Sequence, residues 1–258
     1  MNSRIEALRQ QSFELKPSIS IERALLETEF YKENSGKYPL PVLRALCFKH
    51  ICEQKTLYIG DGELIVGERG PSPKAVPTFP ELTCHSSEDL RILNDRKMTS
   101  YLVKKKDIAR YEETVIPYWQ GRSMRDRIFS QVPDEWRTAY EAGLFTEFME
   151  QRAPGHTALD GTIYTLGMVD YKRRIAERIK KLDFHNDPEA SDKKEQLQAM
   201  DIACDAAIIF ARRHADLAET MAAVESNPDR RKELLRIAEI CRKIPAHKPD
   251  TFHEAIQM

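Results

Sequence analysis

The chain has 258 residues and a mass of 29.8 kDa, enough for one or two domains. Its 40 Lys and Arg residues nearly balance 41 Asp and Glu residues, so the formal net charge is -1. Such a balance gives no reason to expect nucleic acid or an anionic membrane as the main partner. With 41% hydrophobic and 31% charged residues, the composition is that of a globular protein, neither disordered nor membrane-spanning.

The sequence lacks the features of membrane and secreted proteins, which predicts the location of the protein. No stretch approaches the roughly 18 apolar residues of a transmembrane helix, and Met1–Glu6 leads into a polar helix where a secretory signal would have an apolar core. The cysteines are odd in number, scattered and without a Cys-x-x-Cys pair: Cys47, Cys52, Cys84, Cys204 and Cys241. We therefore expect a reducing cytoplasm, ordinary core or surface thiols, and neither a disulfide framework nor a metal site.

Three helices are predicted before residue 56. The first has apolar residues in a charged background and ends at Pro17. Ser20 is the expected N-cap of the second, which closes at 34–36 with Asn-Ser-Gly. The third opens at 39–41 with Pro-Leu-Pro, because proline is tolerated in a first helical turn.

The next stretch has the composition of strands and loops. Residues 57–59 and 63–67 are β-prone, and 60–62 (Gly-Asp-Gly) is a strong turn signal between them. Residues 70–80 contain four prolines, so they are an ordered loop or an extended crossing and not a helix or a central strand. The charged pair at 68–69 (Glu-Arg) could bind a polar group, but charges at strand ends are common and favour a structural role.

The rest of the chain is predicted to be mainly helical. Asp187 as N-cap with Pro188 after it, and Asn227 with Pro228, mark the starts of the last two long helices. The predicted helices cover about 86–94, 104–116, 133–142, 164–182, 187–226 and 227–244. Thr251–Glu254 is a capping box that announces one more helix. Because one turn is not stable alone, we expect the natural chain to continue, or the gene product to be truncated.

Few motifs point to chemistry. The phosphate-loop, dinucleotide, nucleophile-elbow and His-Glu-x-x-His patterns are all absent. His156 follows Pro154-Gly155 in an irregular stretch, where turn chemistry places its imidazole to donate to or accept from a ligand. The alternative is a histidine that caps nearby backbone. His214 lies in an Ala-rich helix and is expected to be a core or solvated residue.

Several segments together resemble the glycyl radical enzymes, the pyruvate formate lyase-like family. The segments that resemble the family are 21–24, 61–70, 154–156, 238–241 and 249–255. The resemblance covers essentially residues 1–258 and corresponds to the N-terminal portion of the family's domain, incomplete at its C-terminal end. It implies a ten-stranded α/β barrel wrapped by helices. This portion would supply outer helices and the first barrel elements, so it should be mostly α.

The resemblance also implies a mechanism and partners. A separate activating enzyme, which uses S-adenosylmethionine and an iron–sulfur cluster, would install a glycyl radical near the C-terminus of the full-length protein. That radical would generate a thiyl on a barrel cysteine, which abstracts hydrogen from a small-molecule substrate so that a leaving group such as water departs. The protein's task would be to hold the substrate and exclude water. The family further suggests a homodimer.

Two site residues follow from the run 145–156, which is similar to the hydroxyproline dehydratase branch of the family. In that branch a Phe and a His at positions matching Phe148 and His156 line the substrate pocket. The histidine contacts the substrate and the phenylalanine packs against its ring. The implied reaction is loss of water from a small hydroxylated substrate such as trans-4-hydroxy-L-proline. Branches that act on choline, glycerol or isethionate, or as formate-lyases, remain alternatives.

The chain also departs from the family pattern. None of its cysteines follows a glycine, so the Gly-Cys-x-Glu loop is absent, and so is the Arg-Val-x-Gly radical motif. The catalytic residues are therefore expected beyond Met258, and residues 1–258 alone should be inactive. The alternative is a non-catalytic helical module, in which the long C-terminal helices bind a partner.

Overall fold

Helices make up most of the protein, seen in a computed structural model that describes residues 3–145 and 159–258. This confirms the mostly α prediction, while the ten-stranded barrel stays a prediction, because the described residues form only two short strands. Two compact units are present. The first unit comprises Met1–Lys16, Glu29–Ala75 and Leu159–Met258, and the second comprises Pro17–Thr28 and Val76–Ala158.

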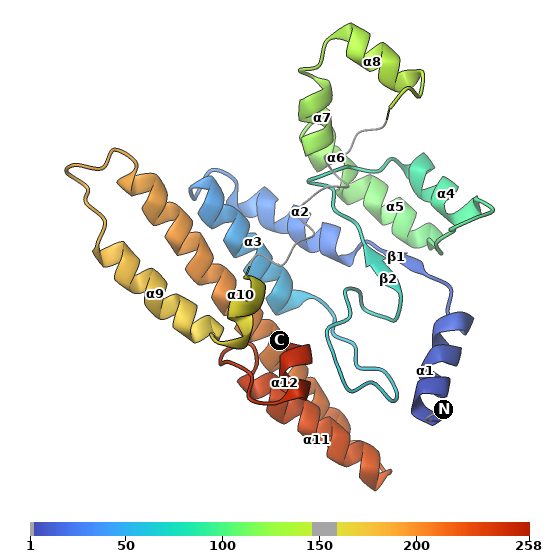
Figure 1. The fold of residues 1–258 in the computed structure, drawn as a ribbon. Helices are drawn as coiled ribbons and strands as arrows, with labels where there is room; N and C mark the ends of the chain where they lie inside the picture. The colour runs from blue at the N-terminus through green and yellow to red at the C-terminus, as the bar shows by residue number, and fades with distance from the viewer. Residues whose placement is uncertain (1–2, 146–158) are drawn as a thin grey trace. The chain divides into compact units, whose positions relative to one another are not determined.

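The elements of each unit are labelled in Figure 1. The first unit contains α1 (Ser3–Glu14), α3 (Leu40–Gln54), a 3-10 helix η1 (Asp160–Tyr164), α9 (Met168–Lys180), α10 (Ala190–Val224), α11 (Pro228–Lys243) and α12 (Phe252–Gln257). The second unit contains β1 (Ser18–Ser20), α4 (Ser87–Asp95), α5 (Lys105–Thr114), α6 (Ile116–Trp119), α7 (Met124–Phe129) and α8 (Asp134–Glu141). The unit boundary falls within α2 (Glu22–Asn34) and β2 (Ala75–Pro77).

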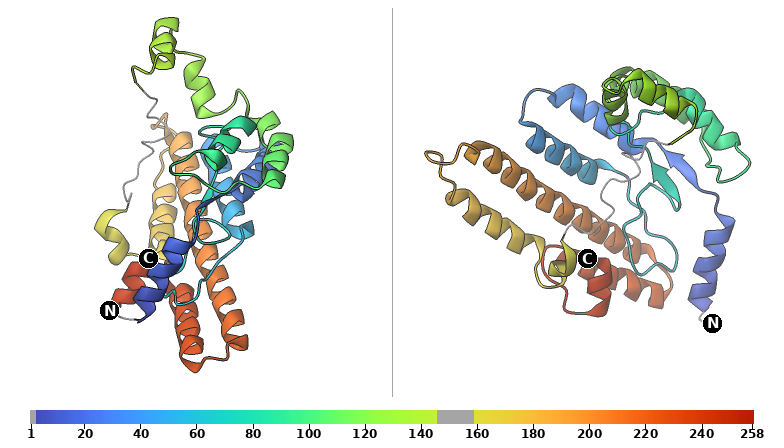
Figure 2. Two further views of the ribbon diagram at one scale, coloured as in Figure 1. Left: turned by 90° about the vertical axis from the view of Figure 1, so that its right-hand side faces the viewer. Right: turned by 45° about the horizontal axis from the view of Figure 1, so that its top comes forward.

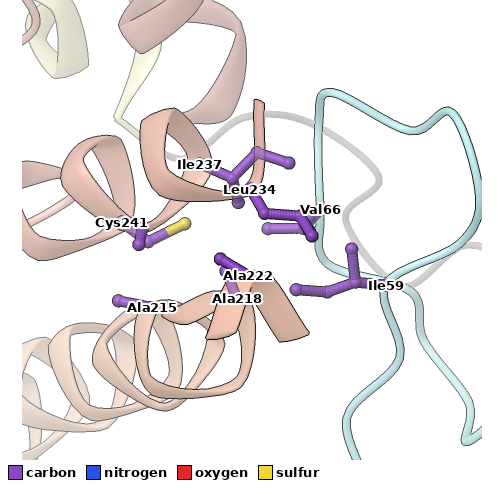
Figure 3. Close-up of a cluster of buried hydrophobic side chains, with 9 residues drawn as sticks. Ile59, Val66, Ala215, Ala218, Ala222, Leu234, Ile237 and Cys241 are labelled. Carbon is purple, nitrogen blue, oxygen red and sulfur yellow. The ribbon is translucent and has the colours of Figure 1, made fainter. Parts of the chain in front are cut away.

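The first unit is organised around α10, a 35-residue helix about 52 Å long at 1.5 Å per residue. Helices α3, α9 and α11 pack along it, as both views show (Figures 1 and 2). Small residues on α10 allow α11 to approach closely, and branched side chains fill the space between them (Figure 3). This cluster consists of Ile59, Val66, Ala215, Ala218, Ala222, Leu234, Ile237, Ala238 and Cys241.

The long helices of this unit carry charged residues along their length. No helix in the part of the chain that the structure describes is both long and apolar enough to cross a membrane.

Several predicted helix ends are confirmed at the level of hydrogen bonds. The Asn227 side chain accepts from the backbone N–H groups of Asp229 and Arg230 at 2.9 and 3.2 Å. Thr251 and Glu254 form the predicted capping box, although only six residues follow Thr251 within the helix. Such side chains supply partners to N–H groups that the helix itself leaves unpaired.

Two predicted helix starts are wrong by a few residues. Helix α10 begins at Ala190, because the Asp187 carboxylate accepts from the N–H of Glu189 at 3.0 Å and forms a turn before the helix. Helix α9 begins at Met168, after η1. Gly167 there lies so close to the 246–247 backbone that any side chain would collide with it. The approach lets Met168 N–H donate to the Pro245 carbonyl at 2.9 Å.

The two β-prone runs at 57–59 and 63–67 are not strands, which corrects the prediction. Side chains from distant helices bind their backbone in place of a neighbouring strand. The Arg230 guanidinium donates to the carbonyls of Gly60 and Glu63, both at 2.8 Å. The Gln257 amide bonds both the N–H and the carbonyl of Val66 at 2.9 Å. The β-prone composition instead reflects burial, since Val66 belongs to the core cluster.

The second unit contains the strands that the sequence did not reveal. Ser20, predicted as an N-cap, lies in β1, which pairs with β2. Its hydroxyl still accepts from the N–H of Glu22 at 3.4 Å, so it retains part of the predicted role. Strands of three residues show no alternation long enough to detect. The position of β2 agrees with the extended crossing expected for the proline-rich stretch.

A packed core and two helices that were not predicted, α6 and α7, complete the second unit. Leu90, Tyr111 and Val115 are fully buried, and the Trp119 indole N–H donates to the Thr28 hydroxyl at 2.9 Å. Helix α7 was not predicted. Its signal is the capping residue Ser123, which accepts from the N–H of Asp126 at 3.1 Å.

A charge cluster around the buried Glu27 also lies in this unit. The Arg23 guanidinium donates to one oxygen of Glu27 at 2.9 Å and to both oxygens of Glu81 at 3.0 and 2.6 Å. Burial raises the pKa of Glu27 to about 9, against the opposing effect of Arg23 and with help from the neighbouring Glu81. One cation thus serves two carboxyl groups, and the burial of Glu27 favours its protonated form at neutral pH.

This protonation predicts a pH dependence. Because the folded pKa of Glu27 exceeds its ordinary value of 4.5, the contribution of Glu27 to the free energy of unfolding should be fully present below pH 4.5 and be lost as pH rises to about 9. Glu27→Gln removes that titration and should flatten the decline. Urea unfolding followed by tryptophan emission reports on the second unit, since Trp119 and Trp136 both lie there. Exposed Glu88→Gln is the control; equal slopes for Glu27→Gln and wild type would contradict the assignment.

The side-chain contacts of residues 57–67 predict a local effect. Gln257→Ala removes both hydrogen bonds to Val66, and losing one is worth about 1 kcal/mol. Hydrogen exchange of the Val66 amide should then be about fivefold faster, as measured by NMR. The same substitution at exposed Gln198 on α10 is the matched control and should leave that amide unchanged. Unaltered exchange in Gln257→Ala would show that this loop does not need the contact.

Candidate functional site

The two predicted substrate residues, Phe148 and His156, lie outside the described residues. The structure does describe the chain on either side of them. Phe145 precedes Phe148 by three residues, and Leu159 follows His156 by three. Phe145 belongs to the second unit and Leu159 to the first, so the surroundings of each are described by themselves.

Four aromatic rings gather around α7 and α8. We call Phe129, Trp136, Tyr140 and Phe145 the α7–α8 aromatic cluster. The ring centroids of Trp136 and Phe145 are 4.7 Å apart. Trp136 and Tyr140 stack at 5.7 Å with an angle of 3°, and Phe129 meets both edge-on at 5.4 and 5.0 Å. Stacked and edge-to-face geometries at these separations are the favourable ones for aromatic pairs.

A cation fixes this cluster further. The Arg125 guanidinium lies 4.3 Å from the ring centre of Phe129 and 5.8 Å from that of Tyr140. It also donates to the Tyr140 hydroxyl at 3.2 Å. From α8, Arg137 donates to the Phe129 carbonyl at 2.7 Å. Helices α7 and α8 are thus joined by rings and guanidinium groups.

A glycine turn directs the chain from α8 back onto the cluster. Gly143 has φ +75°, a conformation that favours glycine. Its N–H donates to the Tyr140 carbonyl at 2.9 Å, and the N–H of Leu144 donates to the Ala139 carbonyl at 3.1 Å. This pair of bonds is a Schellman motif. It leaves Leu144 77% exposed while the ring of Phe145 meets Trp136.

The chain that follows the site is ordered by its own contacts in the first unit. The N–H of Thr162 donates to the Leu159 carbonyl at 3.2 Å, within the turn that forms η1. The hydroxyl groups of Thr162 and Tyr171 lie 2.8 Å apart and share a hydrogen bond, which ties η1 to α9.

The other residues considered from the sequence have structural roles. The Glu68 carboxylate accepts from the N–H of Arg69 at 3.1 Å, and Lys55 donates to the carbonyls of Glu68 and Arg69 at 3.2 and 2.8 Å. These contacts favour the structural interpretation of the pair. His214 is 2% exposed with Nδ1 3.0 Å from the Phe210 carbonyl, and burial lowers its pKa. It is a core histidine.

The thiols do not form a reactive centre. None of the five cysteines forms a disulfide, and only Cys84 is more than slightly exposed. Burial raises the pKa of Cys52, Cys84 and Cys241 to about 11. They hold little thiolate at neutral pH and do not fit the role of a reactive cysteine. Within residues 3–145 and 159–258, no group of His, Cys, Asp and Glu side chains could hold a metal ion.

Sequence reasoning missed the aromatic cluster. Trp136 and Tyr140 were inside a predicted helix at a spacing of four residues, which places them on one face. That spacing is a usable signal. The contact of Phe145 with Trp136 could not be predicted from the sequence, because it depends on the turn at Gly143.

Comparison with known proteins identifies relatives along the whole chain. Residues 1–258 match the pyruvate formate lyase-like family. The chain is 51% identical to trans-4-hydroxy-L-proline dehydratase of Clostridioides difficile, over 99% of this chain and 32% of that protein. It is 31% identical to isethionate sulfite-lyase of Nitratidesulfovibrio vulgaris, over 94% of this chain and 30% of that protein.

Solved structures agree with these relatives. The C. difficile hydroxyproline dehydratase with trans-4-hydroxy-L-proline bound has a TM-score of 0.94 and covers 99% of this chain, which spans 32% of it. The B12-independent glycerol dehydratase of Clostridium butyricum has a TM-score of 0.91 at 31% identity, with 100% of this chain and 33% of that one covered.

The chain spans about a third of the length of these relatives. This coverage fits the predicted correspondence to the N-terminal part of the family. The match along the full chain, together with a shared fold at 51% identity, confirms the resemblance drawn from the sequence, and the chain belongs to the pyruvate formate lyase-like family.

Proposed function

We propose that this chain is part of a glycyl radical dehydratase that removes water from trans-4-hydroxy-L-proline. The supporting observation is its 51% identity and TM-score of 0.94 to a hydroxyproline dehydratase with that substrate bound. Relatives named for isethionate or glycerol are 26% to 32% identical. The difference favours hydroxyproline over the other substrates of the family.

Two residues are proposed to contact the substrate. His156 would hydrogen-bond the substrate through its imidazole, and Phe148 would pack against the substrate ring. Both roles come from the resemblance of the run 145–156.

The radical chemistry is proposed to come from groups outside residues 1–258. A glycyl radical enzyme from Archaeoglobus fulgidus is among the relatives, at 32% identity and a TM-score of 0.87. The buried thiols of this chain do not fit the radical-transfer cysteine. We therefore propose that residues 1–258 supply scaffold and substrate contacts and are inactive alone. An activating enzyme that uses S-adenosylmethionine and an iron–sulfur cluster, a homodimer and a cytoplasmic location complete the proposal.

A chimera tests the substrate and both residues. This chain replaces the matching third of the C. difficile hydroxyproline dehydratase, and the purified protein is activated under anaerobic conditions. Dehydration of trans-4-hydroxy-L-proline is then measured. His156→Ala should lower kcat/KM by about 100-fold, the loss expected when a substrate is no longer held in place. Phe148→Ala should mainly raise KM.

The control for the histidine is exposed His185, substituted in the same way. Its variant should turn over at the wild-type rate. If His156→Ala also does so, His156 is not a substrate contact. If the wild-type chimera dehydrates glycerol or cleaves isethionate but leaves hydroxyproline unchanged, the proposed substrate is wrong.

A further inference from the structure

We propose that His214 makes a contact between α3 and α10 sensitive to acid. The contact consists of the Arg213 and Lys55 side chains with the backbone carbonyls that they bind, and we call it the α3–α10 latch. A proton taken up by the His214 ring would open the latch and release the loop at 55–69. All of these residues lie in the first unit, and the inference does not depend on the substrate proposed above.

The surroundings of His214 favour one neutral form of its ring. The residue is buried, and Nδ1 lies 3.0 Å from the Phe210 carbonyl. Because a carbonyl only accepts hydrogen bonds, Nδ1 carries the hydrogen in this contact. Nε2 then holds a lone pair, and within the described residues it has no hydrogen-bond partner. A proton added there would become a buried donor without an acceptor, which is costly.

Two cations beside the ring oppose that proton. The Lys55 ammonium lies 4.9 Å from the ring centre of Phe210, which in turn is 4.5 Å from the ring centre of His214. Burial lowers the pKa of His214, against the hydrogen bond to Phe210, and the charges of Lys55 and Arg213 lower it further. In the part of the chain that the structure describes, no carboxylate of α3, α9, α10 or α11 offsets these two charges at the ring.

The same two cations hold the backbone that would be released. Helix α3 lies along α10 in both views (Figures 1 and 2). Arg213 donates to the carbonyls of Cys52 and Lys55 at 2.6 and 2.9 Å, which fastens the end of α3 to α10. Lys55 donates to the carbonyls of Glu68 and Arg69 at 3.2 and 2.8 Å, which joins the two ends of the loop. A charged imidazole would repel both of these side chains.

The direction of the pH effect follows from proton binding in the two states. In the open state the ring is solvated and titrates near its ordinary value of 6.5, whereas in the closed state it takes up a proton only at lower pH. The open state therefore binds more protons as pH falls. Opening should become more favourable by up to about tenfold for each unit below pH 6.5, until the closed state is protonated too.

Hydrogen exchange followed by mass spectrometry tests the latch. The quantity compared is the change in exchange of residues 55–69 between about pH 7.5 and about pH 5.5, after correction for intrinsic rates. In wild type, exchange should become up to about tenfold faster, while α11 stays protected. In His214→Phe, which keeps a ring that cannot be protonated, it should change less than about twofold. His185→Phe removes an exposed histidine instead and should respond like wild type.

NMR of protein labelled with ¹⁵N in its histidines examines the ring directly. At neutral pH the hydrogen of His214 should be on Nδ1, and the ring should titrate below its ordinary value of 6.5. His214→Gln is a second neutral variant, for use in the exchange measurement if His214→Phe does not fold.

Three results would overturn the inference. The first is a His214 ring that carries its hydrogen on Nε2 or titrates at 6.5 or above. The second is an equal response of residues 55–69 to acid in wild type and in a folded neutral variant. The third is loss of protection in α11 together with 55–69, because the acid effect would then be unfolding of the whole unit and not the opening of a latch.

Discussion

The close approach of α10 and α11 is the contact on which the first unit depends. Alanines along α10 leave room for Leu234 and Ile237, and the two helices then offer their charged side chains to the loops around them. Arg213 of α10 donates to the carbonyls of Cys52 and Lys55 at the end of α3, at 2.6 and 2.9 Å. Arg230 of α11 likewise donates to the carbonyls of Gly60 and Glu63 in the loop after α3. A shift between the two helices would therefore unpair backbone groups well away from their interface.

Helix starts were predictable where a capping side chain lies nearby in the sequence. The strands carried no such local signal. Asn227 and Thr251 cap helices through side chains within three residues, so their effect is written in the adjacent sequence. The loop at 57–67 depends on Arg230 and Gln257, which lie more than 160 residues away. No local pattern reports a partner at that distance. The loop's β-prone residues correctly indicated that the loop is buried. They wrongly predicted that its backbone would hydrogen-bond to a neighbouring strand.

The candidate site shows the same division between local and distant information. His156 was recognised because Pro154-Gly155 precedes it, and its role with Phe148 came from the family resemblance. The neighbouring rings were only partly visible, since the spacing of Trp136 and Tyr140 is local but the return of Phe145 requires a left-handed residue at Gly143. Family membership thus named the residues expected at the substrate, while the structure identified the scaffold from which they extend.

The burial of Glu27 has a consequence for calorimetry. Folded Glu27 retains a proton that an unfolded glutamate gives up at neutral pH, because its pKa returns to the ordinary range. Unfolding of the second unit is then accompanied by proton release to the solvent. The heat measured for that transition includes the heat of protonating the buffer, so phosphate and Tris solutions at the same pH would report different apparent enthalpies for one and the same structural change.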